Sequence, residues 1–157
     1  MKKSALSPQA QKGFTLIEVM TVVAVVAILA ALAAPSFTTL IANQRVTSTA
    51  QELQALIEFA RAESVYKRTE STVTATGQKW QVKVGDQVLR EATMSDAVSI
   101  EPGSDGGVAF EVSGQARPAS GGAPPYTLSF SATDATRVHC LSVTGPGLVK
   151  LQRVACP

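Results

Sequence analysis

Histidine and cysteine are scarce in this chain, and charged residues are fewer than in most soluble domains. One histidine and two cysteines among 157 residues leave little material for a zinc site or a Cys–His enzyme. The same count excludes a small domain held together by many disulfides. Charged residues make up 17% of the chain, against about 25% in an average domain, which excludes a disordered polyelectrolyte. The length suits one domain with a modest core.

The positive charge lies mostly at the N-terminus. Lys2, Lys3 and Lys12 precede residue 13, and no acidic residue accompanies them. Without residues 1–13, the 14 basic residues fall to 11 against 12 acidic ones, and the net charge changes from +2 to −1. The pI of about 8.7 therefore depends on the lysines of the first thirteen residues. It does not by itself support a nucleic-acid partner.

Residues 14–34 form an apolar run whose polar members are Thr15, Glu18 and Thr21. As a helix, the run would span roughly 30 Å, the thickness of the hydrocarbon core of a bilayer. The basic residues before it favour a cytoplasmic N-terminus. A secretory signal peptide and an ordinary single-span anchor are the alternatives, but the run is longer than a usual signal and contains an acidic residue.

Glu18 needs a partner, because a carboxylate in hydrocarbon costs on the order of 3 kcal/mol. A cut after Gly13 would free the α-amino group of Phe14, four residues before Glu18. A neighbouring subunit shifted along the helix axis would then bring its amine to this carboxylate.

Residues 12–18, KGFTLIE, followed by the apolar run, resemble the class III signal of type IV pilins and type II secretion pseudopilins. The resemblance implies that a prepilin peptidase cuts between Gly13 and Phe14 and methylates Phe14. It also implies that Glu18 docks on a neighbour's Phe14 amine, and that Pro35 is a helix-weakening position. The expected partners are the peptidase, other pilins or pseudopilins, the inner-membrane assembly platform and, before assembly, inner-membrane lipid.

The resemblance divides the chain into a cleaved leader (1–13), a transmembrane and filament-core helix (14–35) and a periplasmic head (36–157). Within the head, the spacing of apolar residues predicts an amphipathic helix over 36–68, with a bend at Pro35. Its buried face is expected at positions 46, 50, 53, 56, 57, 60 and 64. Segments of this helix, Asn43–Val46, Glu52–Leu53 and Phe59–Ser64, look like those of GspH/FimT-type minor pilins. We interpret most of these residues as packing the helix on its own sheet.

After residue 68 the pattern changes to short runs that favour β-strands, separated by turn-forming residues. The predicted strands are 71–76, 79–84, 88–92, 98–101, 107–112, 126–131, 137–143 and 148–155, and residues 114–125 are predicted to be an exposed loop. The expected fold class is α+β, a type IV pilin fold whose long N-terminal helix packs on one C-terminal antiparallel sheet over 71–156.

Cys140 and Cys156 are assigned to the last two strands and, in the periplasm, are expected to form a disulfide. His139 precedes Cys140 directly, but neighbouring side chains of a strand point to opposite faces, so a catalytic pair is not expected. Asp96, Glu101, Asp105 and Glu111 match no EF-hand spacing and are interpreted as a solvated surface. We therefore expect no catalytic residue, no cofactor and no metal, and a protein that is not an enzyme.

The resemblance also raises DNA as a partner, because some FimT-type pilins bind it through paired arginines before the C-terminal cysteine. Here the matching stretch carries only Lys150 and Arg153, and in a strand their odd spacing places them on opposite faces. Two divided cations supply little affinity for phosphates, so DNA is not an expected partner. The sequence therefore predicts a minor type IV pilin near the pilus tip, with a minor pseudopilin of type II secretion or a DNA-binding pilin as alternatives.

Overall fold

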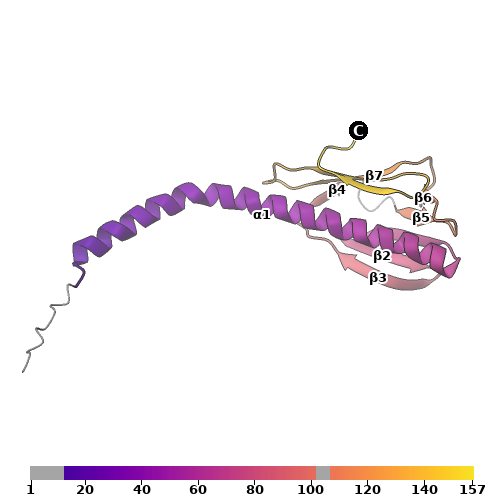
Figure 1. Cartoon of the computed structure of the whole chain (residues 1–157), viewed down its shortest axis with the longest axis horizontal. Helices are drawn as coiled ribbons and strands as arrows, with labels where there is room; N and C mark the ends of the chain where they lie inside the picture. Colours follow the sequence, from indigo (N-terminus) through magenta and orange to yellow (C-terminus); the bar gives the residue numbers. More distant parts are fainter. Residues whose placement is uncertain (1–12, 102–106) are drawn as a thin grey trace, which may run out of the picture. The chain divides into compact units, whose positions relative to one another are not determined.

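The computed structural model describes residues 13–101 and 107–157, and the side chains of residues 33–35 are outside that description. The chain divides into two compact units, Met1–Ser36 and Phe37–Pro157, which are treated separately below. Helix α1 (Leu16–Lys67) contributes to both (Figure 1). The predicted cleavage position, Gly13–Phe14, is at the start of the described residues. Pro35, where a bend was predicted, is one of the residues whose side chains are not described.

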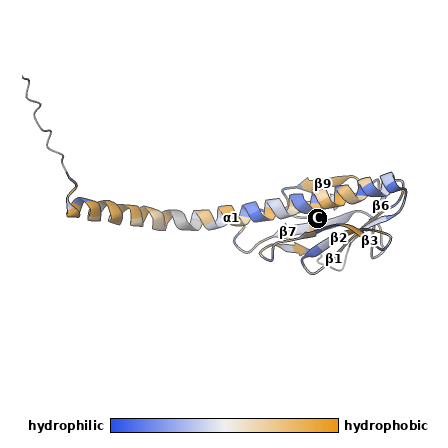
Figure 2. Ribbon diagram, turned by 90° about the horizontal axis from the view of Figure 1, so that it is seen from below, coloured by the Kyte–Doolittle hydropathy of each residue, from blue (hydrophilic) through white to orange (hydrophobic). Residues whose placement is uncertain are grey.

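In the first unit the described residues form the N-terminal part of α1, which is mostly hydrophobic (Figure 2) and carries Glu18 in its first turn. No single helix of the described residues is long and apolar enough to cross a membrane on its own. The segments Leu16–Leu32 and Ser36–Lys67, taken as one broken span, do meet the criteria of length and composition.

The second unit begins with the amphipathic part of α1. Its apolar face is buried at every predicted position, from Val46 to Ser64, which confirms the helical spacing read from the sequence. The helix ends at Lys67, because Arg68 takes the left-handed conformation (φ 51°) and Thr69 N–H donates to Ser64 O at 3.3 Å. This bond closes a Schellman motif, the usual way for a chain to leave a helix.

The strands form two antiparallel sheets, so the expectation of one sheet is wrong. One sheet has the order β3-β2-β1-β5-β6 and the other β4-β7-β8-β9. Their bounds are β1 Ser71–Thr76, β2 Lys79–Val84, β3 Gln87–Thr93, β4 Ser99–Glu101, β5 Val108–Phe110, β6 Ala116–Pro118, β7 Tyr126–Ser131, β8 His139–Val143 and β9 Val149–Gln152. The strand periodicity identifies every strand except β6. Pairing partners depend on contacts between distant segments, and β4 pairs with β7 and not with its neighbours in sequence.

Strand β6 lies inside the segment 114–125, which was predicted to be loop throughout. It pairs with β5 at the edge of the first sheet, and Ala116 N–H also donates to Gly145 O at 2.8 Å. Pro118 is tolerated there because β6 is an edge strand, whose last residue needs no further ladder bond. The Gly- and Pro-rich composition therefore hid a short strand.

One hydrophobic core joins α1 to both sheets. It contains Leu53, Ile57 and Ala60 from the helix, Val73, Trp80 and Phe110 from the first sheet, and Leu128, Phe130 and Leu141 from the second. None of the core residues comes from the first unit. The second unit is thus a self-contained head.

Candidate processing, docking and head sites

The peptide bond between Gly13 and Phe14 lies just before α1 and is open to solvent. No heavy atom lies within 4 Å of the position that a Cβ on Gly13 would take, and Phe14 is 82% exposed. The two residues are therefore accessible to an enzyme. This geometry is what a cleavage site at Gly13–Phe14 requires.

Thr15 and Glu18 form the start of α1. Glu18 N–H donates to Thr15 Oγ1 at 3.3 Å, so Thr15 is the N-cap and Glu18 occupies the third helical position. A negative charge at that position interacts favourably with the positive end of the helix dipole. The Thr-x-x-Glu spacing therefore also stabilises the start of the helix. This role of Glu18 was not predicted from the sequence.

The carboxylate of Glu18 has no ion-pair partner within the part of the chain that the structure describes. It borders a shallow hollow of about 220 Å³ lined also by Phe14, Val19, Val22 and Val23. An apolar hollow with one carboxylate at its edge fits a small cationic group, such as an amine, from outside the chain.

The apolar side chains of the first unit are exposed, from Leu16 to Leu32. An exposed apolar surface of this extent marks contact with lipid or with other proteins. The N-terminal helix therefore requires a partner that the chain does not supply.

In the head, Asn43 connects α1 to the loop between β7 and β8. Its Oδ1 accepts from Thr136 N–H at 3.0 Å and from Arg137 N–H at 2.9 Å, and its Nδ2 donates to Thr136 Oγ1 at 3.2 Å. Asn43 is buried, so these bonds give its amide the partners that a buried polar group needs. The sequence feature that could have indicated this role is the position of Asn43, a polar residue on the inner face of an amphipathic helix.

Arg61 connects α1 to turns of both sheets. Its Nε donates to Gly114 O at 3.3 Å and its Nη2 to Pro146 O at 3.2 Å. Gly147 (φ 82°) packs so closely on Gly114 O that a Cβ at residue 147 would overlap it. These contacts agree with the interpretation that the family-like residues of α1 pack the helix on its own sheets.

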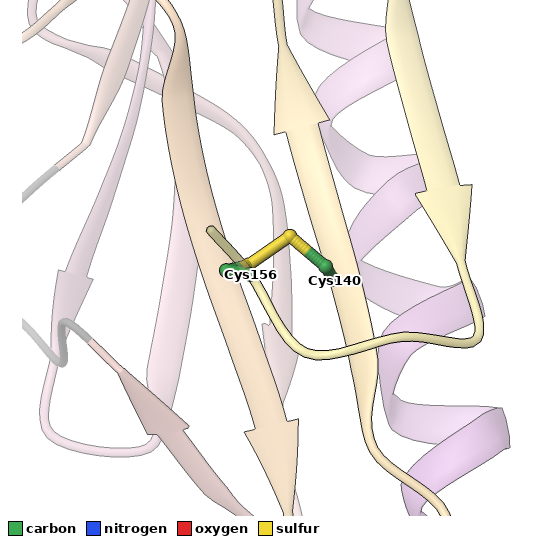
Figure 3. The surroundings of a disulfide bond; sticks show 2 residues. All are labelled: Cys140 and Cys156. Atoms are coloured by element: carbon green, nitrogen blue, oxygen red, sulfur yellow. A yellow bond between two sulfur atoms is a disulfide. The ribbon is translucent and has the colours of Figure 1, made fainter.

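Cys140 and Cys156 form a disulfide with a Cα–Cα distance of 5.0 Å, which confirms the predicted bridge (Figure 3). Cys140 lies in β8, but Cys156 follows the end of β9, so its assignment to the last strand is wrong. The segment after β9 crosses β8 and is held there by the bridge (Figure 3). Because both cysteines are in the bridge, Cys140 is not a free thiol beside His139.

Lys150 and Arg153 are not brought together. Lys150 lies in β9 opposite Ser142, whereas Arg153 follows the strand and lines a hollow beside Gln51 and Gln54 of α1. Among the described residues, no three His, Cys, Asp or Glu side chains are grouped so that they could hold a metal; Asp105 is outside that part of the chain.

Comparison with protein families gives two matches. Residues 8–34 match the prokaryotic N-terminal methylation motif, and residues 49–147 match the family described as type II transport protein GspH. No curated protein gives a significant match.

Two solved structures share the fold. The type IV minor pilin FimU of Pseudomonas aeruginosa has a TM-score of 0.57 at 18% identity, over 69% of this chain and 89% of FimU. The minor pseudopilin EpsH from the type 2 secretion system of Vibrio cholerae has a TM-score of 0.53 at 12% identity, over 69% of this chain and 97% of EpsH. The α+β fold with a long N-terminal helix and antiparallel sheets is therefore that of minor pilins and pseudopilins.

Proposed function

Because the chain belongs to the GspH family of minor pilins and pseudopilins, we propose that it is a non-catalytic minor subunit of a type IV pilus, located near the tip. Before assembly it is held in the inner membrane by the helix of residues 14–35, with the N-terminus cytoplasmic and the head periplasmic. The observation that carries the proposal is the exposed apolar helix, preceded by an open Gly13–Phe14 bond and followed by a self-contained head.

Processing comes first in the proposed mechanism. Prepilin peptidase cuts after Gly13 and methylates Phe14, which removes residues 1–13 and leaves an amine four residues from Glu18. In the filament, the amine of one subunit then pairs with Glu18 of a neighbour, and the apolar helices cover one another. The pairing removes the cost of a lone carboxylate in apolar surroundings.

Cleavage is tested in cells with and without the peptidase. The wild-type chain is expected to migrate faster when the peptidase is present, and mass spectrometry should find methylated Phe14 at the new N-terminus. Gly13→Leu should remain uncut, whereas Gly121→Leu, a change at an open surface glycine, should be cut normally. Equal mobility of the wild-type chain in both strains would disprove processing.

Docking is tested with Glu18→Gln, which keeps the size of the side chain and removes its charge. We expect normal cleavage and at least a tenfold loss of incorporation into sheared filaments, as measured by immunoblot. Glu52→Gln, at an exposed position of α1 in the head, is the matched control and should assemble normally. Normal assembly of Glu18→Gln would contradict the pairing.

A minor pseudopilin of type II secretion is the second candidate, and the description of the matching family favours it. Co-purification of the cross-linked chain with pilus subunits supports the first candidate, and co-purification with secretion pseudopilins supports the second. A DNA-receptor role predicts salt-dependent binding of duplex DNA that is lost in a Lys150→Gln/Arg153→Gln variant; absence of binding at low salt would exclude it.

A further inference from the structure

A polar hollow of about 270 Å³ lies in the head between α1 and the end of the second sheet. Its lining residues are Thr47, Gln51 and Gln54 from α1, His139 from β8, Leu151 from β9, and Arg153 just beyond β9. These residues come from three segments that only the tertiary structure brings together. The hollow is separate from the N-terminal docking segment and from the disulfide.

The hollow has positive charge and no carboxylate in its lining. Arg153 takes part in no ion pair or hydrogen bond within the described chain, and it presents a planar guanidinium group. Glu58 of α1, one turn after Gln54, does not line the hollow and accepts a hydrogen bond from Gln54 Nε2 at 2.8 Å. The cation is therefore unpaired on the side of the molecule where α1 and β9 meet.

His139 is the second unsatisfied group. It is 1% exposed, and its Nδ1 is enclosed without a hydrogen-bond partner. Burial lowers the pKa of His139, and the positive charges of Arg153 and Arg137 lower it further, so the ring is neutral at neutral pH. A buried atom that lacks a partner is more often an acceptor than an N–H donor. Nδ1 is therefore assigned as the acceptor, and the ring proton of His139 is placed on Nε2.

The hollow therefore offers several hydrogen-bond donors and one positive charge, but no negatively charged acceptor. Arg153 supplies a fork of N–H groups, Gln51 supplies an amide that makes no hydrogen bond among the described residues, and His139 supplies Nε2–H. By contrast, Thr47 Oγ1 already donates to Asn43 O at 2.8 Å. A planar anion with two oxygens matches this set, because guanidinium binds carboxylate through two parallel bonds.

We propose that this hollow binds a carboxylate side chain, Asp or Glu, of a neighbouring subunit in the filament. The inference rests on the proposed function, which places other pilins or pseudopilins against the head. A single cation beside two amides suits one carboxylate group, whereas nucleic acid requires several cations along a surface. Binding would give Arg153 a counter-charge that no described residue supplies, and it would give the Nε2–H of His139 an acceptor, while Nδ1 stays without a partner.

The single histidine of the chain makes a direct test possible. Full-length protein labelled with ¹⁵N-histidine in detergent micelles is titrated with sodium acetate, with sodium chloride at equal ionic strength as the blank. We expect a saturable shift of the His139 ring resonances with acetate alone. Arg153→Gln should weaken acetate binding at least tenfold, and Lys150→Gln, which removes the same charge from the exposed side of β9, should change it less than twofold.

Absence of a saturable shift, or a shift that Arg153→Gln leaves unchanged, would overturn the site. Inorganic phosphate is titrated in parallel, and binding at least as tight as that of acetate would overturn the assignment to a carboxylate. In cells, Arg153→Glu should be cleaved normally but lose most of its incorporation into filaments, with Lys150→Glu as control. Normal incorporation of Arg153→Glu would show that the bound carboxylate does not come from a neighbouring subunit. The acetate titration does not depend on assembly, so it tests the site separately from the proposed function.

Discussion

The buried side chain of Asn43 stabilises the head by accepting hydrogen bonds from backbone N–H groups. Replacing it with alanine leaves the N–H groups of Thr136 and Arg137 without their acceptor. We expect Asn43→Ala to lower the free energy of unfolding by about 2 kcal/mol. Urea unfolding of the full-length chain in detergent, followed by the fluorescence of buried Trp80, measures this change. Gln44→Ala, at the exposed neighbouring position, should change it by less than about 0.5 kcal/mol.

Arg68 is a residue in a conformation that favours glycine. Its φ of 51° places it in the left-handed region at the end of α1, where a Cβ is strained. Arg68→Gly should therefore raise the free energy of unfolding by about 0.5–1 kcal/mol in the same urea experiment. Arg68→Ala retains the Cβ and should give no such gain; an equal gain from alanine would refute the conformational explanation.

At the scale of elements, the turn after β8 is held by close backbone contact. A side chain on Gly147 would overlap Gly114 O and displace Arg61, whose guanidinium joins α1 to both sheets. We expect Gly147→Ala to destabilise the head by about 3 kcal/mol. Gly121→Ala is the matched control, because Gly121 also has positive φ (87°) but faces open space, and it should cost only about 1 kcal/mol.

The segment after β9 depends on the disulfide for its position. Cys140 and Cys156 are 16 residues apart, and closing a loop of that length contributes roughly 3 kcal/mol. The double variant Cys140→Ala/Cys156→Ala should lose about that amount of stability in urea. Dithiothreitol should destabilise the wild-type chain similarly and have no effect on the variant. Equal stability of the wild type and the variant would show that the bridge is dispensable.

At the scale of the whole molecule, the two units differ in what stabilises them. The core lies entirely within Phe37–Pro157, whereas the apolar side chains of the first unit remain exposed. We therefore expect a fragment of residues 37–157 to fold alone, with a free energy of unfolding within about 1 kcal/mol of the full-length chain in detergent. A fragment without cooperative Trp80 unfolding would show that the first unit supports the head.

The local features of the chain were readable without a structure because each depends on residues close in sequence. The buried stripe of α1 follows from helical spacing, and most strands were identified near their observed bounds. Strand β6 was missed because its pairing with β5, and not its Gly- and Pro-rich composition, makes it a strand. One sheet was predicted where the structure has two, because the pairing of β4 with β7 joins segments that are far apart along the chain.

The sequence alone determined the processing motif, the apolar helix with Glu18, the amphipathic continuation and the two cysteines, since these are patterns of composition and spacing. Only the tertiary structure decided that Asn43 and Arg61 hold loops of the sheets, and that His139, Gln51 and Arg153 meet at one hollow. The reason is physical: these hydrogen bonds and this hollow join α1 to residues more than fifty positions later in the chain, and their geometry exists only after the core has packed around α1.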